Sequence, residues 1–397
     1  MNNKIKLAVA SAVLASASVA NAGITWTAGD WTVDMNGNVN AFAIVSENDD
    51  TVTTQGAMTN NQSNDDSAAS INTGLLPSWL GFTATTRQND IDTSVTISFQ
   101  PGASTTGALA GGGGSENRQA FLTFGDKSWG SVKVGKDLGI FGSTAILNDM
   151  TLLGVGSQGV VGASGGTTTT LGRIGTGYIY ADWNGQIAYT TPNMNGFSAT
   201  LGVMQPWNST ASGNLSQATT GNTDEFGYQG QASYSWTGDF AGKVWGGFFS
   251  QEVTGFGTGS DDTATAYEAG VSATVMNINL VAYGYSGDGV GTTGLLRDGY
   301  DTAGESRDSD GYYAQATYVI PMGTKLGVSY GESKLDLASG EAANALVKEN
   351  EMLTIGAYHP LTKHLNLVAE YSDVESKSHD GQSSTSDIFS VGAILFF

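Results

Sequence analysis

The sequence has no cysteine, only 6 prolines among 397 residues, and no apolar run near the ~20 residues that a transmembrane helix needs. The missing apolar run excludes a helical inner-membrane protein. The lack of cysteine is compatible with an oxidising export route, although it names no compartment. Charged residues make up only 13% of the chain, against about 25% in typical globular proteins. This composition is unusual for a soluble enzyme.

Basic residues are especially scarce. Lysine and arginine number 16 against 37 aspartates and glutamates, which gives a formal net charge of −21. Few cations are therefore present to neutralise phosphates, which argues against nucleic-acid binding. Turn-like stretches carry much of the acidity, namely Asp49-Asp50, Asp65-Asp66, Asp261-Asp262 and Asp308 with Asp310. These carboxylates are interpreted as belonging to solvated loops or, alternatively, as ligands of divalent cations that are shared with lipopolysaccharide phosphates.

Glycine and aromatic residues are abundant, at 56 residues and 10% of the chain. Together with many serines and threonines, they fit β-strands that have one lipid-facing side and are bordered by aromatic girdles. The abundant residues therefore suggest a membrane β-protein.

The first 22 residues have the features of a secretory signal peptide. Lys4 and Lys6 form a positive start, residues 7–19 form a short apolar run, and Ala20-Asn21-Ala22 is an A-x-A cleavage site. We expect this segment to be removed. The mature chain, residues 23–397, then forms one domain with 14 basic and 37 acidic residues.

Alternation with a period of two is the main structural signal. In segment 91–100, IDTSVTISFQ, apolar residues and threonine at odd positions alternate with polar residues at even positions. Segments 33–45, 267–275 and 365–371 show the same pattern, which is typical of strands with one oily and one polar face. In a soluble sandwich the oily face is a core, whereas in a membrane barrel it faces lipid and the polar face lines water.

Three further features favour the barrel. About sixteen such segments follow one another, short turns alternate with long polar loops, and the last strand alternates up to the terminal Phe397, like the insertion signal of outer-membrane proteins. The segments are 31–45, 78–87, 91–100, 117–125, 130–137, 176–190, 196–204, 226–237, 241–253, 264–276, 278–286, 310–320, 324–333, 350–359, 363–375 and 386–397. The sequence therefore predicts an all-β transmembrane antiparallel β-barrel of about 16 strands.

Three motifs resemble the trimeric general porins of Gram-negative bacteria. Residues 117–136, NRQAFLTFGDKSWGSVKVGK, are similar to a hairpin of that family, residues 187–197 to its I-x-Y-x-[ST]-P-x-[FM]-x-G-F, and residues 78–82 to its S-R-[LF]-G-F. The resemblance covers the mature chain. It implies sixteen strands, a homotrimer, and a water-filled channel in the outer membrane for passive diffusion of ions and small hydrophilic solutes.

The resemblance also implies a long third loop, here about residues 138–170, that folds inward and narrows the pore. Its first half is rich in apolar residues, which favours packing against a barrel wall. In the family, acids on this loop face basic residues on the wall. The constriction residues that follow are Lys136, Asp137, Asp149, Arg118, Arg87, Trp79 and Asp182.

Departures from the family pattern weaken the expected charge clamp. Lys136 keeps a positive charge at an arginine position of the motif, but Trp79 replaces one arginine and Asp182 stands near the place of another. Arg87 and Arg118 partly restore the positive side if they point inward. The hypothesis is a weak transverse field and a mild preference for cations, because acidic linings favour cation entry. The alternative is that these acids lie far from the constriction and selectivity is negligible.

Other motifs carry little weight. Residues 154–159 fit G-x-G-x-x-G and residues 162–166 fit G-x-S-x-G, but neither has the strand-to-helix context that its chemistry needs. His359, His364 and His379 lack metal-ligand spacing. No catalytic group and no cofactor site is identified, apart from the divalent cations considered above. An enzyme is therefore the least favoured function.

Two alternatives to a diffusion channel remain open. One is a substrate-specific outer-membrane channel in which Trp79, Trp183 and loop aromatics form a selective path. The other is a non-conducting surface adhesin or structural barrel. The expected partners are further copies of the chain, outer-membrane lipid with lipopolysaccharide, and small solutes.

Overall fold

The computed structural model describes residues 23–49, 54–59, 67–103, 115–158, 169–210, 224–254 and 261–397. The predicted signal peptide, residues 1–22, lies outside the described residues. Regular structure in these ranges is nearly all β-strand, and the helical turns are α1 (Ser143–Asn148) and the 3-10 helix η1 (Met150–Leu153). No helix within the described ranges is long and apolar enough to cross a membrane.

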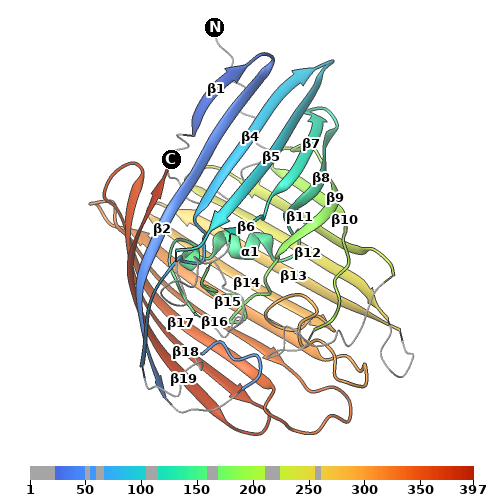
Figure 1. Cartoon of the computed structure of the whole chain (residues 1–397), viewed down its shortest axis with the longest axis vertical. Coiled ribbons are helices and arrows are strands. Elements are labelled where there is room, and N and C mark those ends of the chain that lie inside the picture. Colours follow the sequence, from blue (N-terminus) through green and yellow to red (C-terminus); the bar gives the residue numbers. More distant parts are fainter. Residues whose placement is uncertain are drawn as a thin grey trace.

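Sixteen antiparallel strands form a closed barrel, which the pairing of β19 with β2 completes (Figure 1). They are β2 (Trp31–Asp49), β4 (Trp79–Gln88), β5 (Ile91–Pro101), β7 (Ala120–Asp126), β8 (Gly130–Leu138), β9 (Trp183–Thr190), β10 (Phe197–Met204), β11 (Gly227–Trp236), β12 (Phe240–Val253), β13 (Asp262–Val275), β14 (Ile278–Asp288), β15 (Asp308–Val319), β16 (Lys325–Leu335), β17 (Val347–Pro360), β18 (Leu365–Ser378) and β19 (Ser383–Phe396). The predicted barrel is confirmed.

The polarity of strand β5 is the reverse of that of a soluble protein, whereas apolar side chains of other strands, such as Phe249 of β12 and Ile388 of β19, belong to a buried interior cluster. In β5, Val95 and Ile97 are 39% and 43% exposed, whereas their polar neighbours Ser94, Thr96 and Ser98 are at most 5% exposed. The apolar side chains of β5 therefore face outward, and its polar side chains face the interior. This inversion is the pattern of a barrel whose outer surface contacts lipid.

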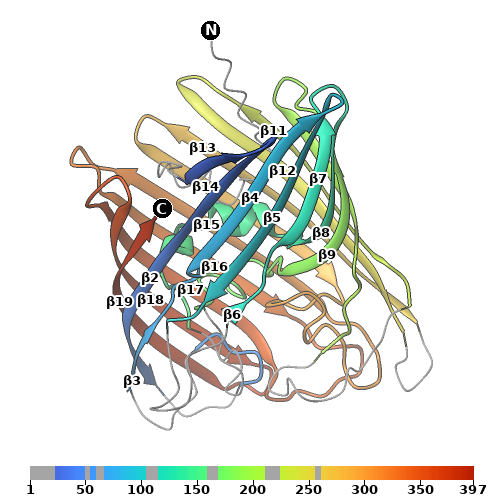
Figure 2. The same ribbon diagram turned by 45° about the horizontal axis from the view of Figure 1, so that its top comes forward.

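Short turns and long connections lie at opposite ends of the barrel (Figure 2). The turn between β4 and β5 contains Asn89 and Asp90, whose φ angles are 49° and 61°. Two successive left-handed residues are the geometry of a tight hairpin turn, and asparagine and aspartate tolerate it better than other non-glycine residues. The alternation of short turns and long loops expected from the sequence is present in the structure.

Three short strands and one shortened strand differ from expectation. β1 (Ile24–Ala28) and β3 (Ser67–Asn72) both pair with β2, and β6 (Ser115–Glu116) pairs with β5. The strand predicted at 176–190 begins only at Trp183. The reason is local: the φ angles of Gly177 (144°) and Asp182 (48°) are incompatible with a continuous strand.

Candidate functional site

The segment that connects β8 to β9 contacts the inner faces of several strands, and we call its described parts, residues 139–158 and 169–182, the inner segment. Gln229 of β11 accepts hydrogen bonds from the backbone N–H groups of Ile140 (2.8 Å) and Phe141 (3.0 Å). Glu268 of β13 accepts one from Gly142 (2.9 Å). Gly142 is the N-cap residue of α1 and has no side chain to cap the helix, so side chains of the wall satisfy backbone donors at this end.

A second pair of wall residues holds the next part of the inner segment. Gln315 of β15 accepts a hydrogen bond from the backbone N–H of Met150 (2.6 Å). Glu370 of β18 accepts bonds from the backbone N–H groups of Val155 (2.6 Å) and Gly156 (3.0 Å). The inner segment is thus tied to the wall formed by β11 to β18, and α1 lies within the ring of strands (Figure 1).

The first two glycines of the G-x-G-x-x-G match, Gly154 and Gly156, have a structural role in this contact, and the third, Gly159, lies outside the described residues. A Cβ atom at position 154 would collide with the carboxylate of Glu370, and Gly156 has a φ of 56°. A side chain at position 154 would push the segment away from Glu370, and one at position 156 would strain the backbone. Glycine at these two positions therefore allows the inner segment to pack closely against β18.

Asp149 is a structural residue of the inner segment. Its carboxylate accepts hydrogen bonds from the backbone N–H of Thr151 (2.9 Å), the hydroxyl of Thr151 (2.6 Å) and the hydroxyl of Tyr178 (2.9 Å). The carboxylate thereby caps η1 and joins the two halves of the inner segment. Burial, together with the neighbouring Asp149, raises the pKa of Tyr178, which stays protonated.

Arg173 fastens the second half of the inner segment to the same wall. Its guanidinium donates hydrogen bonds to the carbonyl oxygens of Met352 on β17 (2.9 Å) and Ser329 on β16 (3.0 Å), and its side chain is fully buried. Burial lowers the pKa of Arg173, and the nearby Asp149 carboxylate opposes this shift. Sequence reasoning missed this residue, because an arginine in a glycine- and threonine-rich stretch has no periodic signal.

A cavity of about 580 Å³ lies between the inner segment and the strands that are not tied to it. On the inner segment it is lined by Ile146, Leu147 and Leu152, and on the facing side by Trp79 at the start of β4 and Trp183 at the start of β9. The wall side chains that hold the inner segment are absent from this lining. The inner segment therefore packs backbone donors and buried apolar side chains, such as Phe141, against one wall, and it presents other apolar side chains, such as Leu147, to the cavity.

Arg118 is the most extensively bonded charge of the cavity lining. Its Nε donates to a carboxylate oxygen of Glu116 (2.7 Å), its Nη1 donates to the hydroxyl of Tyr180 (3.4 Å), and its guanidinium carbon lies 5.8 Å from the ring centre of Trp183. Burial alone would lower its pKa, but Tyr180 and Glu116 outweigh that effect and raise the pKa above its ordinary value. Arg118 is therefore a permanent cation at this position.

Tyr180 joins Arg118 to Trp183. The indole Nε1–H of Trp183 donates a hydrogen bond to the hydroxyl oxygen of Tyr180 (2.8 Å). Burial raises the pKa of Tyr180 to about 12, although Arg118 acts in the opposite direction. Its hydroxyl remains protonated at physiological pH.

Two further loops complete the cavity. Leu75 and Leu76, between β3 and β4, donate backbone hydrogen bonds to carbonyl oxygens of the inner segment at 2.9 Å and 3.2 Å. The loop between β14 and β15 accepts one from Tyr180 at Thr293 (2.8 Å) and places Arg297 on the lining. The contribution of these loops was not predicted, because pairing between distant loops leaves no local pattern.

The structure separates the seven residues expected at a constriction. Trp79, Arg118 and Asp182 lie on the cavity. Asp149 is buried in the inner segment, and Arg87 lies near the short-turn end of β4, paired with Asp92 (2.8 Å) and Asp126 (3.0 Å).

Lys136 and Asp137 occupy opposite faces of β8. Asp137 is buried, pairs with Lys133, and accepts a hydrogen bond from Gln119 (3.0 Å). Lys136 is exposed, lies opposite the exposed Ala120 in the β-ladder, and donates to the carbonyl oxygen of Asn117 (2.9 Å). Facing residues of a ladder share a face, so the structure directs Lys136 away from the face of Asp137.

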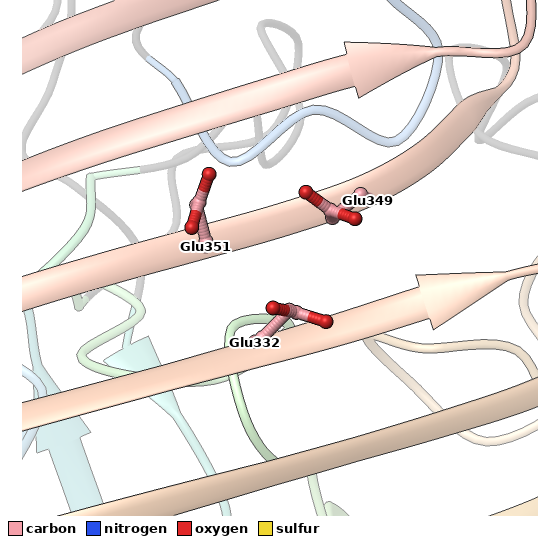
Figure 3. Close-up of side chains that lie close together, drawn as sticks. All are labelled: Glu332, Glu349 and Glu351. Atoms are coloured by element: carbon pink, nitrogen blue, oxygen red, sulfur yellow. The ribbon is translucent and has the colours of Figure 1, made fainter.

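One carboxylate cluster in the described ranges has oxygen atoms close enough to hold a metal ion. Glu332 of β16 and Glu349 and Glu351 of β17 place these atoms within 4.8 Å of one another (Figure 3). Lys377 pairs with Glu349 and Glu351, both at 2.9 Å, and Lys334 pairs with Glu332. The lysines already neutralise much of this charge, so the cluster is an ion-pair network on the strands and is not one of the acidic loop stretches noted in the sequence.

Comparisons with known proteins agree on the architecture. A family model described as Gram-negative porin matches residues 8–379. The outer-membrane channel DcaP of Acinetobacter baumannii is 16% identical, with a TM-score of 0.69, 94% of this chain covered and 99% of that chain. The anion-selective porin from Comamonas acidovorans is 16% identical (TM-score 0.63; 92% and 100% covered), and the trimer form of OmpT from Vibrio cholerae is 15% identical (TM-score 0.53; 92% and 99%). No curated protein sequence matches the chain.

Proposed function

The chain belongs to the Gram-negative porin family and is a channel of the outer membrane of a Gram-negative bacterium, and we propose that ions and small hydrophilic solutes diffuse through it passively. The observation that carries the proposal is the inverted polarity of β5 in the closed barrel. Ser94, Thr96 and Ser98 of β5 face the interior, while the valine, isoleucine and phenylalanine side chains of this strand face outward. A polar interior of this kind holds water.

The inner segment supplies the narrowing of this channel. It is fixed to the wall formed by β11 to β18, which leaves the passage on the side of β4 to β9, where Trp79, Arg118 and Asp182 lie on the cavity. This arrangement supports the long inward-folded third loop expected from the family resemblance.

A weak transverse field and a mild cation preference form the finer part of the proposal. The acids Asp137 and Asp149 are both engaged by neighbouring donors, and Arg87 pairs with Asp92 and Asp126, so these charges are compensated locally. The excess of acidic residues over the whole chain favours cations at the mouths. The Comamonas porin is anion-selective, so barrel architecture alone does not set the sign.

Conductance of the purified protein in a planar bilayer tests the function. We expect large, nearly ohmic steps, and under a salt gradient a reversal potential of the sign that cation preference requires. A folded, heat-modifiable barrel that carries no current would refute the channel, and a reversal potential of the opposite sign would refute only the preference. Seminative gels test the proposed homotrimer, which the trimer form of the Vibrio protein supports.

Three further points stay predictions: the contact with lipopolysaccharide, the binding of divalent cations by the acidic loops, and the absence of enzymatic activity. Glu349 and Glu351, which are paired with Lys377, face outward at the long-loop end of β17, where the headgroups of an outer leaflet would meet the barrel. Extraction of the trimer with and without a chelator, followed by analysis of copurified lipid, tests this part.

A further inference from the structure

We propose that the cavity beside the inner segment is a binding subsite for organic solutes that have an apolar body and one carboxylate. The inference rests on the proposed channel function and adds a solute class to it. The cavity volume of about 580 Å³ lies within the range of ~300–1,000 Å³ that small-molecule sites occupy.

The apolar part of the proposal follows from the lining. The inner segment contributes leucine and isoleucine side chains, represented by Leu147 and Leu152, and the opposite side contributes the indole rings of Trp79 and Trp183. A path for strongly hydrated solutes alone does not need apolar side chains on both of its sides. Apolar contact from two sides favours a flat or branched hydrocarbon group, whose transfer from water into such a space is favourable.

The sign of the polar group follows from the charges on the lining. The Glu116 carboxylate is paired with Arg118 at 2.7 Å. Burial raises the pKa of Asp182, and the charges of Arg118 and Lys136 oppose this shift without cancelling it. Arg297 forms no ion pair with any residue that the structure describes. One cation on the lining is therefore left for an incoming anion.

Tyr180 adds a neutral donor beside this cation. Its hydroxyl oxygen accepts hydrogen bonds from Trp183 (2.8 Å) and Arg118 (3.4 Å), so its own proton points away from both groups. A tyrosine hydroxyl has one proton to donate. The backbone hydrogen bond from Tyr180 to Thr293 (2.8 Å) brings it to the loop that carries Arg297, and together the two side chains suit a carboxylate.

Block of the ion current by added solutes tests the subsite. The probes are 3-phenylpropionate, propionate, phenethylamine and phenylalanine, each added to one side of a bilayer that contains wild-type channels. We expect saturable block by 3-phenylpropionate at a lower concentration than by any other probe. Equal potency of propionate would refute the apolar contact, and stronger block by the amine or the zwitterion would refute the assigned sign.

Variants separate this inference from the proposed function. Arg297→Gln should raise the half-blocking concentration of 3-phenylpropionate about tenfold, as expected for a lost charge-assisted bond, and Tyr180→Phe, which keeps the ring, should raise it severalfold. Lys127→Gln, in the exposed turn after β7, removes the same charge and should leave block unchanged. Wild-type conductance without selective block, or equal block of all three variants, overturns the subsite alone. A folded wild-type barrel that carries no current overturns the channel itself.

Discussion

Replacement of Glu370 by alanine should loosen the inner segment without opening the barrel. The carboxylate accepts hydrogen bonds from the backbone N–H groups of Val155 and Gly156 and from the hydroxyl of Tyr358 (2.6 Å). A hydrogen bond to a charged group contributes about 1.5–3 kcal/mol. Loss of the two that hold the inner segment should therefore lower its local opening free energy by about 3 kcal/mol, roughly a hundredfold in the opening equilibrium.

Hydrogen–deuterium exchange of a peptide that spans residues 150–157 measures this change directly. We expect faster exchange at Val155 and Gly156 in Glu370→Ala, an intermediate rate in Glu370→Gln, which keeps one acceptor, and noisier single-channel currents. Glu351→Ala, on the outward face of β17, removes a carboxylate that does not contact the inner segment and is the matched control. Unchanged exchange in an intact Glu370→Ala barrel would show that the carboxylate does not hold the segment.

Three other perturbations test separate parts of the structure. Arg173→Met removes the bonds to Met352 and Ser329 and should speed exchange in residues 170–178; equal rates would refute the anchor. Asp149→Asn keeps the size but weakens the cap of η1 and should cost about 1 kcal/mol of local stability in the same assay. Arg307, directly before β15, pairs with Glu341 (2.6 Å) in the loop between β16 and β17 and holds the pKa of Glu341 below its ordinary value of 4.5. This ion pair therefore stabilises the two loops above that pH, and the stabilisation is lost as the pH falls through the lowered pKa. Proteolysis of the loops at pH 7 and pH 3 should show the loss in wild type but not in Glu341→Gln.

The strands could be predicted from the sequence because each one faces two different solvents. Lipid on one side and water or the inner segment on the other impose a period of two, which the segment at 91–100 shows over its whole length. The start of β9 could not be predicted in this way, because the left-handed backbone at Asp182 follows from the route of the preceding loop. Alternation of polar and apolar residues indicates which face of a strand a residue occupies, but it does not indicate where the preceding loop ends.

The candidate site could be predicted from the sequence only in part, for a related reason. The apolar content of residues 138–153 predicted packing against a barrel wall. It could not identify Glu268 and Glu370, which lie more than a hundred residues away and accept hydrogen bonds from backbone donors at positions 142 and 155, where no side chain marks the contact. For Lys136, the strand pattern and the family motif gave different predictions. It shares its parity along β8 with Val132 and Val134, which indicates the outward face, whereas the family motif suggested the pore.

The positions of Glu268 and Glu370 affect which charges can select solutes in the channel. Glu268 and Glu370 are buried carboxylates that face the interior, yet their oxygen atoms are occupied by backbone N–H groups of the inner segment and by the hydroxyls of Tyr283 and Tyr358. In the proposed channel, the inner segment separates these two charges from the passage. The field across the cavity then depends on the charged groups of its own lining, which are Glu116, Arg118, Asp182 and Arg297. Changes to the buried acids should alter pore stability and current noise, and changes to the lining should alter which solutes pass.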